Sequence, residues 1–538
     1  MSLFTIVDVD RQSEMLKEDV QSTLRLLLTI ITNGVMLVLS SLAQAWNSIT
    51  KYIQSLTGPT LRNVPEVPGY PVLGILPHMC NQGLYSGTMS KLFEAAQDCG
   101  ISCSSAGTVP IIFLRDPAII RQVFVQNSDN ITRFSPDGTG PFGIMQRITG
   151  NIAASADGKD WHRWRKGFLK EFSNPTALRK SYDDMLRLAK KHVQKMIANK
   201  SGSDLCKAME GYALDTVWSV TLGADNISES ASEFLSVMSG YGAIVGNPSH
   251  LWRHYIRNLL SGKAYREPDH VEKSVGNGIN RVLGGLLDHN LANINPEEPL
   301  GDGNFLRSTS KESGGSNEAP ITEDVLAQAR QVFSLGHEAP TLLLSWAIYE
   351  LSLHPEAIEK LRHEIREHRS DHGDLDFDTI RTMPYLDAVT TELLRLHAPI
   401  SSTARMVTRP IVVETRTNDT VILPPGSHLF ASVHLLHHDK QVWGDNADEF
   451  LPERWTGLRA STSESRCEYL PFLAGPRGCP SSSFVILQMK TMLAVLLSQV
   501  DIELPNSAGV EKLIGGVVSP AKPVNYEVRE LVSSATHK

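Results

Sequence analysis

Hydrophobic residues are most concentrated near the amino terminus, where residues 26–50 carry no charged side chain. Since about 20 apolar residues can cross a bilayer, this run predicts a membrane-anchoring helix. Asn33, Gly34 and Ser40 interrupt it, so a helix lying in the interface or in a core is the alternative. Acidic residues precede the run and Lys51 follows it. That order disfavours a cleaved signal peptide and favours a cytosolic main body.

A proline-rich segment follows, with Pro65, Pro68, Pro71 and Pro77. Each proline removes a backbone donor and stops a helix, so a stiff connector is predicted. An ordinary proline-rich loop fits this segment equally well. We therefore expect four parts: an amino-terminal tail (1–22), a membrane anchor (23–50), a hinge (51–78) and one main body (79–538).

Within the body, apolar residues recur mostly at helical spacing, whereas strand-like runs such as residues 109–114 and 411–413 are short and scattered. The predicted fold class is mainly α with small β-sheets. The polar, glycine-containing residues 296–320 predict a surface loop.

The longest helical pattern covers residues 322–353, with Pro340 in its middle. A proline there removes one amide donor and clashes with the carbonyl of Gly336, so the helix should kink. The kink could open a groove lined by backbone carbonyls, or it could be a packing bend.

Composition narrows the classes of function. The formal net charge is -8, which argues against wholesale binding of nucleic acid. The six cysteines show no paired C-x-x-C spacing, so neither a disulfide framework nor a zinc site is expected. A single thiolate remains available as a metal ligand.

Cys479 is the best candidate for that thiolate. It follows Gly475 and Gly478 and stands just before an apolar helical pattern at residues 484–497. A helix amino terminus favours negative charge, and glycines let backbone amides approach sulfur, so the setting suits a metal-binding thiolate. Taken alone, a loop cysteine is more often a small buried side chain.

The segment around it resembles the cytochrome P450 signature F-x-x-G-x-R-x-C-x-G, through Phe472, Gly475, Arg477 and Cys479. Ser481 stands where the family usually has its last glycine. The resemblance covers about residues 64–525 and implies a cytochrome P450 fold, with residues 79–538 as the haem-thiolate catalytic domain. It also implies haem b, whose iron Cys479 would ligate.

Further motifs occur in the family's order. Glu392 and Arg395 lie three residues apart and can pair on one helix face; by resemblance they form a buried structural network with Arg454. Trp161 and Arg165 match the family's W-x-x-x-R helix, whose side chains face a haem propionate. Arg405 and Arg477 match other propionate-facing arginines.

Residues 159–170 around this motif are rich in lysine and arginine. By resemblance this basic surface receives an acidic electron-donor protein, whereas on charge alone it could be a solvated helix face.

The sequence around the predicted kink resembles the family's oxygen-binding motif A-G-x-E-T-T, with Gly336 and Glu338 matching. Leu335 replaces its small first residue, and Ala339 replaces the usual threonine. Ala339 has no hydroxyl for proton delivery, so Thr341, Glu338 acting through water, or a substrate hydroxyl must complete the relay.

The resemblance implies a monooxygenase that receives electrons from NADPH through NADPH-cytochrome P450 reductase, with cytochrome b5 as a further partner. It would be anchored in the endoplasmic reticulum membrane and face the cytosol. The substrate is expected to be lipophilic, a terpenoid, polyketide or alkaloid. The substrate-facing positions by resemblance are residues 142–148, Phe333, Leu335, residues 401–403 and residues 517–518.

Because Ala339 departs from the family, a haem-thiolate isomerase, dehydratase, desaturase or peroxide-using enzyme is the alternative. A non-enzymatic haem-binding protein is a third reading.

Overall fold

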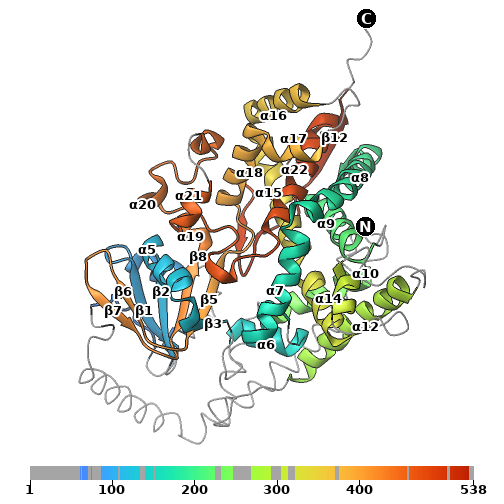
Figure 1. Ribbon diagram of the computed structural model, residues 1–538. Coiled ribbons are helices and arrows are strands. Elements are labelled where there is room, and N and C mark those ends of the chain that lie inside the picture. The colour runs from blue at the N-terminus through green and yellow to red at the C-terminus, as the bar shows by residue number, and fades with distance from the viewer. Residues whose placement is uncertain are drawn as a thin grey trace, which may run out of the picture.

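Helices make up most of the structure, and the strands of the largest sheet gather at one side of it (Figure 1). The structure, a computed structural model, describes residues 61, 63–70, 74–75, 87–106, 109–133, 140–150, 152–223, 232–245, 268–292, 305–312, 322–369, 375–456, 460–505 and 509–531. The predicted tail and membrane anchor, and much of the hinge, lie outside these residues.

The largest sheet has five strands in the order β1 (Ile101–Ala106), β2 (Val109–Leu114), β8 (His428–Ser432), β5 (Ser402–Val407) and β3 (Ile131–Thr132). Only the β2–β8 pair is parallel. The hairpin of β6 (Ile411–Glu414) and β7 (Thr420–Leu423) alternates buried and exposed residues along β6. Both predicted strand runs are therefore confirmed, since apolar β-branched residues fit a half-buried pleated surface.

Two smaller sheets lie near the carboxyl end of the chain. One joins β4 (Ser201–Gly202), β12 (Tyr526–Glu530) and β9 (Val500–Glu503), and the other joins β10 (Lys512–Ile514) and β11 (Val518–Pro520). Mainly helical structure with small sheets is the predicted class, and it is confirmed.

At the centre of the helical part is α22 (Ser482–Gln499), which contacts α8 (Pro175–Asn199) and α18 (Pro384–Leu396) (Figure 1). Nearly every residue from Phe484 to Leu497 is buried, on all sides of the helix. Such a helix is a core element. By length and composition α22 could also cross a membrane, the one such helix among the residues that the structure describes, but 67% of its apolar window is buried inside the protein.

Several helices begin with a capping side chain, which fixes where they start. Asn174 accepts a hydrogen bond from the Thr176 amide at the start of α8. Asp204 does the same for Cys206 at the start of α9 (Leu205–Leu222). These caps satisfy amides that have no partner within the helix.

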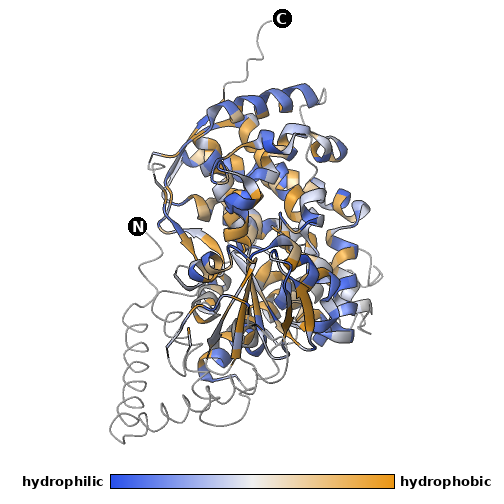
Figure 2. Cartoon of the chain, turned by 90° about the vertical axis from the view of Figure 1, so that its left-hand side faces the viewer, coloured by the Kyte–Doolittle hydropathy of each residue, from blue (hydrophilic) through white to orange (hydrophobic). Residues whose placement is uncertain are grey.

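Other helices pack around this core or against the five-stranded sheet. They are α4 (Met89–Ala95), α5 (Pro117–Arg121), α6 (Gly140–Thr149), α7 (Gly158–Phe172), α10 (Ser232–Val245), α12 (His270–Ala292), α16 (Pro355–His368), α17 (Phe377–Thr382), α19 (Val433–His437), α20 (Lys440–Trp443) and α21 (Ala460–Ser465). Figure 2 shows polar residues on the outermost helices and apolar residues concentrated along the strands.

The predicted loop at residues 296–320 contains a helix, α13 (Phe305–Glu312), so that prediction is wrong for this part. The reason is packing. Phe305 is buried, and its ring lies 4.9 Å from that of Phe168 and 5.3 Å from that of Phe172. The packing of one aromatic side chain stabilises a helix whose other residues are mostly polar. A mostly polar sequence does not predict a helix of this kind, because its stability comes from tertiary contacts.

The predicted helix at residues 322–353 is two helices, α14 (Glu323–Leu335) and α15 (Glu338–Ser352). Thr322 caps α14 by accepting from the Val325 amide at 3.3 Å. Helical bonding resumes when the Thr341 amide donates to His337 at 3.1 Å. Pro340 has no amide to give to the Gly336 carbonyl, so the ladder is interrupted rather than bent. The helix is interrupted at the predicted position, but it divides into two helices where the sequence predicted a kink in one.

Candidate functional site

The loop before α22 is closed by its own backbone. The Cys479 amide donates to the Phe472 carbonyl at 2.8 Å, and the Gly478 amide donates to the Gly475 carbonyl at 3.0 Å. The short helix η7 (Gly475–Arg477) lies between these bonds. Cys479 is therefore held in a tight turn immediately before the amino terminus of α22, as predicted.

Gly475 fits this loop for two reasons. Its φ is +71°, a conformation that side chains other than glycine rarely adopt. A Cβ atom at this position would lie 2.2 Å from the carbonyl oxygen of Phe124, in the π-helical segment η3 (Gln122–Gln126). The close approach joins the cysteine loop to the sheet-bearing part of the molecule.

Four arginines from separate elements converge on the same loop. Arg165 of α7 donates to the Gly478 carbonyl at 2.7 Å, and Arg133, just after β3, donates to the Arg477 carbonyl at 3.3 Å. Arg477 itself donates to the Ala156 carbonyl at 2.7 Å and to the Asp157 carboxylate. The fourth is Arg405 of β5, whose pKa is lowered by the charges of Arg133 and Arg477, so it lies within electrostatic range of both.

Among the residues that the structure describes, the arginines of this cluster outnumber its carboxylates. Burial, and then the charge of Arg477, lowers the pKa of Arg133 to about 10. Burial also lowers the pKa of Arg405 well below its ordinary value, and the charges of Arg133 and Arg477 add to this. Asp157 is the carboxylate that acts against both shifts. Buried cations in excess of anions favour a bound anion.

This arrangement fits haem. Haem carries two propionate carboxylates, and guanidinium groups bind carboxylates through two parallel donors. The Cys479 sulfur belongs to the same region, since a thiolate at this position would raise the pKa of both Arg133 and Arg165. A sulfur ligand and a cationic cluster are thus present together.

The structure brings the sequence-predicted residues of this region together. Trp161 is buried, and the Cζ atom of Arg477 lies 4.0 Å from its ring centroid. The Cζ atom of Arg165 lies 5.8 Å from the same ring. Arg133 and Asp157 were missed by the sequence analysis, because each is an isolated charge outside any motif and only the fold brings it to the loop.

The structure also contains the buried network of Glu392, Arg395 and Arg454 that the sequence predicted. Glu392 and Arg395 share two hydrogen bonds of 2.8 Å, and Arg454 approaches Glu392 at 3.3 Å. Trp455, which was not predicted, donates from its indole nitrogen to Glu392 at 2.9 Å. Arg395 also donates to the carbonyls of His437, Ala447 and Glu449. With its charges paired and hydrogen-bonded, this network holds structure rather than performing chemistry.

The break between α14 and α15 has one open side and one buried side. Leu335 and Glu338 are exposed, whereas His337, Pro340 and Thr341 are buried. The Thr341 hydroxyl donates to the His337 carbonyl at 2.8 Å. Its proton is therefore engaged within the helix. Ala339 brings no hydroxyl to the break, as the sequence implies.

Glu338 has a second carboxyl group nearby. Although solvent reaches Glu338, the surrounding protein desolvates it enough to raise its pKa. Burial raises the pKa of Glu210 on α9 to about 7, and the charges of Asp204 and Glu338 contribute. Burial, and then the charge of Glu338, also raises the pKa of Tyr241 on α10. Glu338 thus lies within electrostatic range of α9 and α10, which no sequence motif indicated.

The positions expected to face a substrate have different surroundings. Phe333 is buried with its ring 4.2 Å from that of Trp218, so it is a core residue in this structure. The Ser401 hydroxyl donates to the Gly515 carbonyl at 2.6 Å, and Thr403 accepts from Arg405 at 2.7 Å. Leu335 is 41% exposed. Of these, Leu335 is the apolar position open to a ligand.

In the segment 142–148, Ile144, Met145 and Ile148 are buried in the main core. Arg147 forms a two-fold hydrogen bond with Glu272 of α12, at 2.9 and 3.0 Å. This ion pair fixes α6 against α12. Val518 is buried as well.

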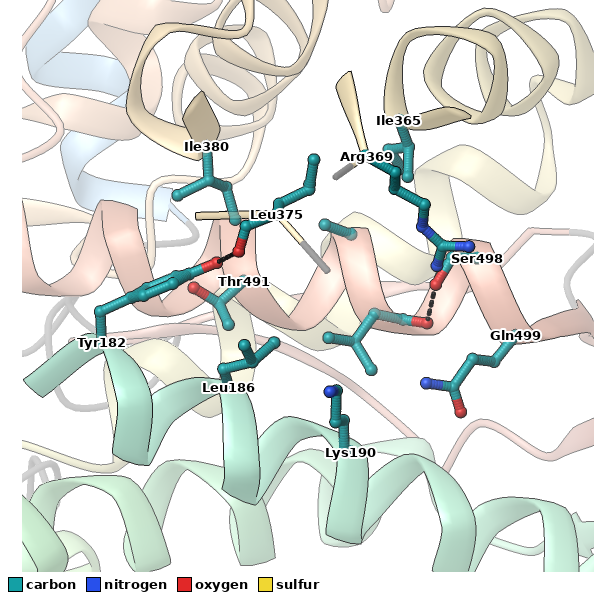
Figure 3. A pocket seen from close by; sticks show the side chains of 12 residues that line it. Tyr182, Leu186, Lys190, Ile365, Arg369, Leu375, Ile380, Thr491, Ser498 and Gln499 are labelled. Carbon is teal, nitrogen blue, oxygen red and sulfur yellow. Dashed lines mark hydrogen bonds between the residues drawn. The ribbon is translucent and has the colours of Figure 1, made fainter. Parts of the chain in front are cut away.

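A separate small cavity lies between α8, α16 and α22 (Figure 3). Its volume is about 20 Å³, which is room for about one water molecule. Tyr182 projects from α8 toward Leu375 and donates to its carbonyl at 2.6 Å. The cavity is too small for an organic ligand and is a packing feature.

The sequence model of one family, described as Cytochrome P450, matches residues 65–528. The chain is 31% identical to "Cytochrome P450 monooxygenase claU" of Ampulloclitocybe clavipes over 222 residues, which are 39% of this chain and 40% of that protein. It is 24% identical to "Cytochrome P450 monooxygenase sphH" of Aspergillus fumigatus over 77% of this chain and 78% of the relative. It is also 24% identical to "Cytochrome P450 4X1" of Rattus norvegicus, over 81% of this chain and 85% of that protein. The claU match thus spans well under two thirds of that relative, whereas the other two span most of theirs.

Proposed function

Because the chain belongs to the cytochrome P450 family, we propose that it is a haem-thiolate monooxygenase that inserts one oxygen atom from dioxygen into a lipophilic small molecule. The observation that carries the proposal is the cysteine loop: Cys479 is held before α22 beside four arginines whose pKa values burial lowers, with Asp157 as the neighbouring carboxylate. A sulfur ligand for iron and a site for two carboxylates are what haem requires.

In this proposal Cys479 would supply the sulfur ligand to the iron of haem b. Trp161, Arg165, Arg405 and Arg477 would hold the propionates, and we propose Arg133 as a further residue of this set, because it donates to the Arg477 carbonyl. Phe472 and Gly475 shape the loop that presents the sulfur. When bound, the haem iron supplies dioxygen activation, with electrons received one at a time and electron density pushed from the thiolate.

The second contribution of the protein in this proposal is proton delivery at the break between α14 and α15. Glu338 is the proposed relay residue, because its carboxyl group lies at the break and burial raises its pKa, which favours the protonated form that can donate. Gly336 is the proposed neighbour of bound oxygen, and it is glycine at a crowded position, since a Cβ atom there would lie 2.4 Å from the Val332 carbonyl oxygen. Thr341 is a weaker candidate, since its proton would first have to leave the His337 carbonyl.

Ala339 supports a second candidate function. Without a hydroxyl at this position, the chain could use peroxide, or could isomerise, dehydrate or desaturate an oxidised substrate. All of these reactions would still depend on Cys479, but they would add no oxygen atom from dioxygen to the product.

The partners and location extend the proposal. Lys159, Arg163, Lys166 and Lys170 are exposed on α7, which suits an acidic electron donor such as NADPH-cytochrome P450 reductase or cytochrome b5. Residues 23–50 would anchor the chain in the endoplasmic reticulum membrane. A terpenoid, polyketide or alkaloid substrate is proposed from the likeness to the fungal monooxygenases claU and sphH.

The test compares the wild-type chain with Cys479→Ala in the producing host, grown under isotopically labelled dioxygen. Cys206→Ala is the matched control, because Cys206 is another partly buried cysteine outside the loop. A product that carries the label, and that disappears in Cys479→Ala alone at equal protein abundance, supports insertion. A product that depends on Cys479 but carries no label excludes insertion and favours the second candidate.

A further inference from the structure

Ser481 places a hydroxyl group beside the sulfur of Cys479. The distance from Ser481 Oγ to Cys479 Sγ is 3.4 Å, within the range of a hydrogen bond to sulfur. The φ of Ser481 is −111°, which a side chain other than glycine adopts without strain. The chain can therefore carry a serine where the family signature has glycine, and the added group reaches the proposed iron ligand.

The hydroxyl is not used to cap the helix. Ser481 is the N-cap residue of α22, a position where serine normally accepts a hydrogen bond from an amide two or three residues later. Here the side chain makes no capping bond. The backbone carbonyl of Ser481 accepts from the Val485 amide at 3.1 Å, so the helix starts normally. The hydroxyl thus has the sulfur as its neighbour.

The direction of the hydrogen bond follows from the chemistry of the sulfur. A free thiol and a hydroxyl can each donate to the other. A metal-bound cysteine is a thiolate without a proton, so it can only accept. In the haem-loaded protein the Ser481 hydroxyl would therefore be the donor.

Resting on the proposed function, we propose that Ser481 is a positioning residue that donates a hydrogen bond to the Cys479 thiolate and thereby tunes the haem iron. Hydrogen bonds to a ligating sulfur withdraw electron density from the metal and set its reduction potential. Ser481 should make the iron easier to reduce and the iron–sulfur bond weaker than in the same chain with glycine.

The test uses the full-length haem-loaded protein and two readouts that do not depend on turnover. One is the reduction potential of the iron, and the other is the iron–sulfur stretching frequency. In Ser481→Ala and Ser481→Gly we expect a more negative potential and a higher stretching frequency. Ser481→Thr, which keeps a hydroxyl, should stay close to the wild-type values. Ser483→Ala is the matched control, since Ser483 is an exposed serine in the same turn.

The outcomes separate the inference from the proposed function. If the wild-type ferrous carbonyl complex lacks the red-shifted Soret band of thiolate ligation, both are overturned. If the band is present but Ser481→Ala and Ser481→Gly keep the wild-type potential and frequency, the inference alone is overturned. A loss of thermal stability without a change in either readout would mean that Ser481 is merely structural, and it overturns the inference as well.

Discussion

The carboxylate of Glu392 and the guanidinium of Arg395 meet one helical turn apart on α18 at 2.8 Å, with neither side chain exposed to solvent. Arg454 and Trp455, both in the short helix η6 (Pro452–Trp455), donate to the same carboxylate. Helix α18 and the segment leading to the cysteine loop are therefore tied together through a single acidic group.

Glu392→Ala should cost about 3–5 kcal/mol in the free energy of unfolding, because it leaves buried cations without their partner. The control is Glu453→Ala, which removes an exposed pair with Lys360 and should cost about 0–1 kcal/mol. Urea unfolding of the full chain in detergent measures both. Equal unfolding midpoints for the two variants would contradict a stabilising role for the network.

Gly475→Ala should prevent the cysteine loop from closing. The positive φ costs about 1–2 kcal/mol for alanine, and the contact with the Phe124 carbonyl costs about 1–3 kcal/mol more. Gly509→Ala is the control, since Gly509 has a φ of +74° but no atom within 4 Å of the added Cβ. Haem content per chain is the measurement. We expect it to fall in Gly475→Ala only, and a similar loss in both variants would show that the close approach is unimportant.

Glu338→Gln should lower product formation by about 10²-fold, the smaller effect typical of losing one proton-transfer group. The absorption spectrum of the ferrous carbonyl complex should stay unchanged, because Glu338 is not part of the cysteine loop. Glu323→Gln, an exposed glutamate at the start of α14, serves as the control. The rate of product formation at equal protein abundance is the quantity to compare, and a wild-type rate in Glu338→Gln would remove this residue from the proposed relay.

Buried histidines should make the fold sensitive to acid. Burial lowers the pKa of His397 to about 4 and that of His437 to about 3. Both values lie below the unfolded value of 6.5, so the unfolded chain binds more protons than the folded chain in acid. Stability is therefore lost as the pH falls from about 6.5 toward 4 and then 3, by up to about 1.4 kcal/mol per pH unit for each histidine.

The slope of unfolding free energy against pH, taken between pH 7 and about 5, tests this expectation. His397→Gln should have a shallower slope than the wild-type chain, whereas the exposed His363→Gln should not. Identical slopes in all three proteins would show that His397 does not contribute.

Sequence pattern predicted the parts of the fold whose cause is local. The run at β2 is apolar with β-branched residues, most buried residues of α22 are apolar, and the glycines before Cys479 indicate a loop. The position of the helix break followed from one proline. These elements are decided by residues close together in the chain.

The rest depends on contacts between distant segments. Helix α13 exists because Phe305 packs against α7, and Arg133 joins the arginine cluster only because β3 pairs with β5. Trp455 donates to Glu392, and the charge of Glu338 helps to raise the pKa of Glu210, so both roles depend on residues far away in sequence. No spacing rule along the chain could have indicated them.

The arginine cluster also links cofactor supply to the life of the protein in the cell. Without a bound dianion, the folded chain keeps several guanidinium charges in a desolvated place where they repel one another. Loading with haem is then part of folding, since a ligand that binds only the native state stabilises it. We expect newly made chains to be degraded when haem is scarce, so that abundance of the protein follows haem synthesis even while its messenger RNA stays constant.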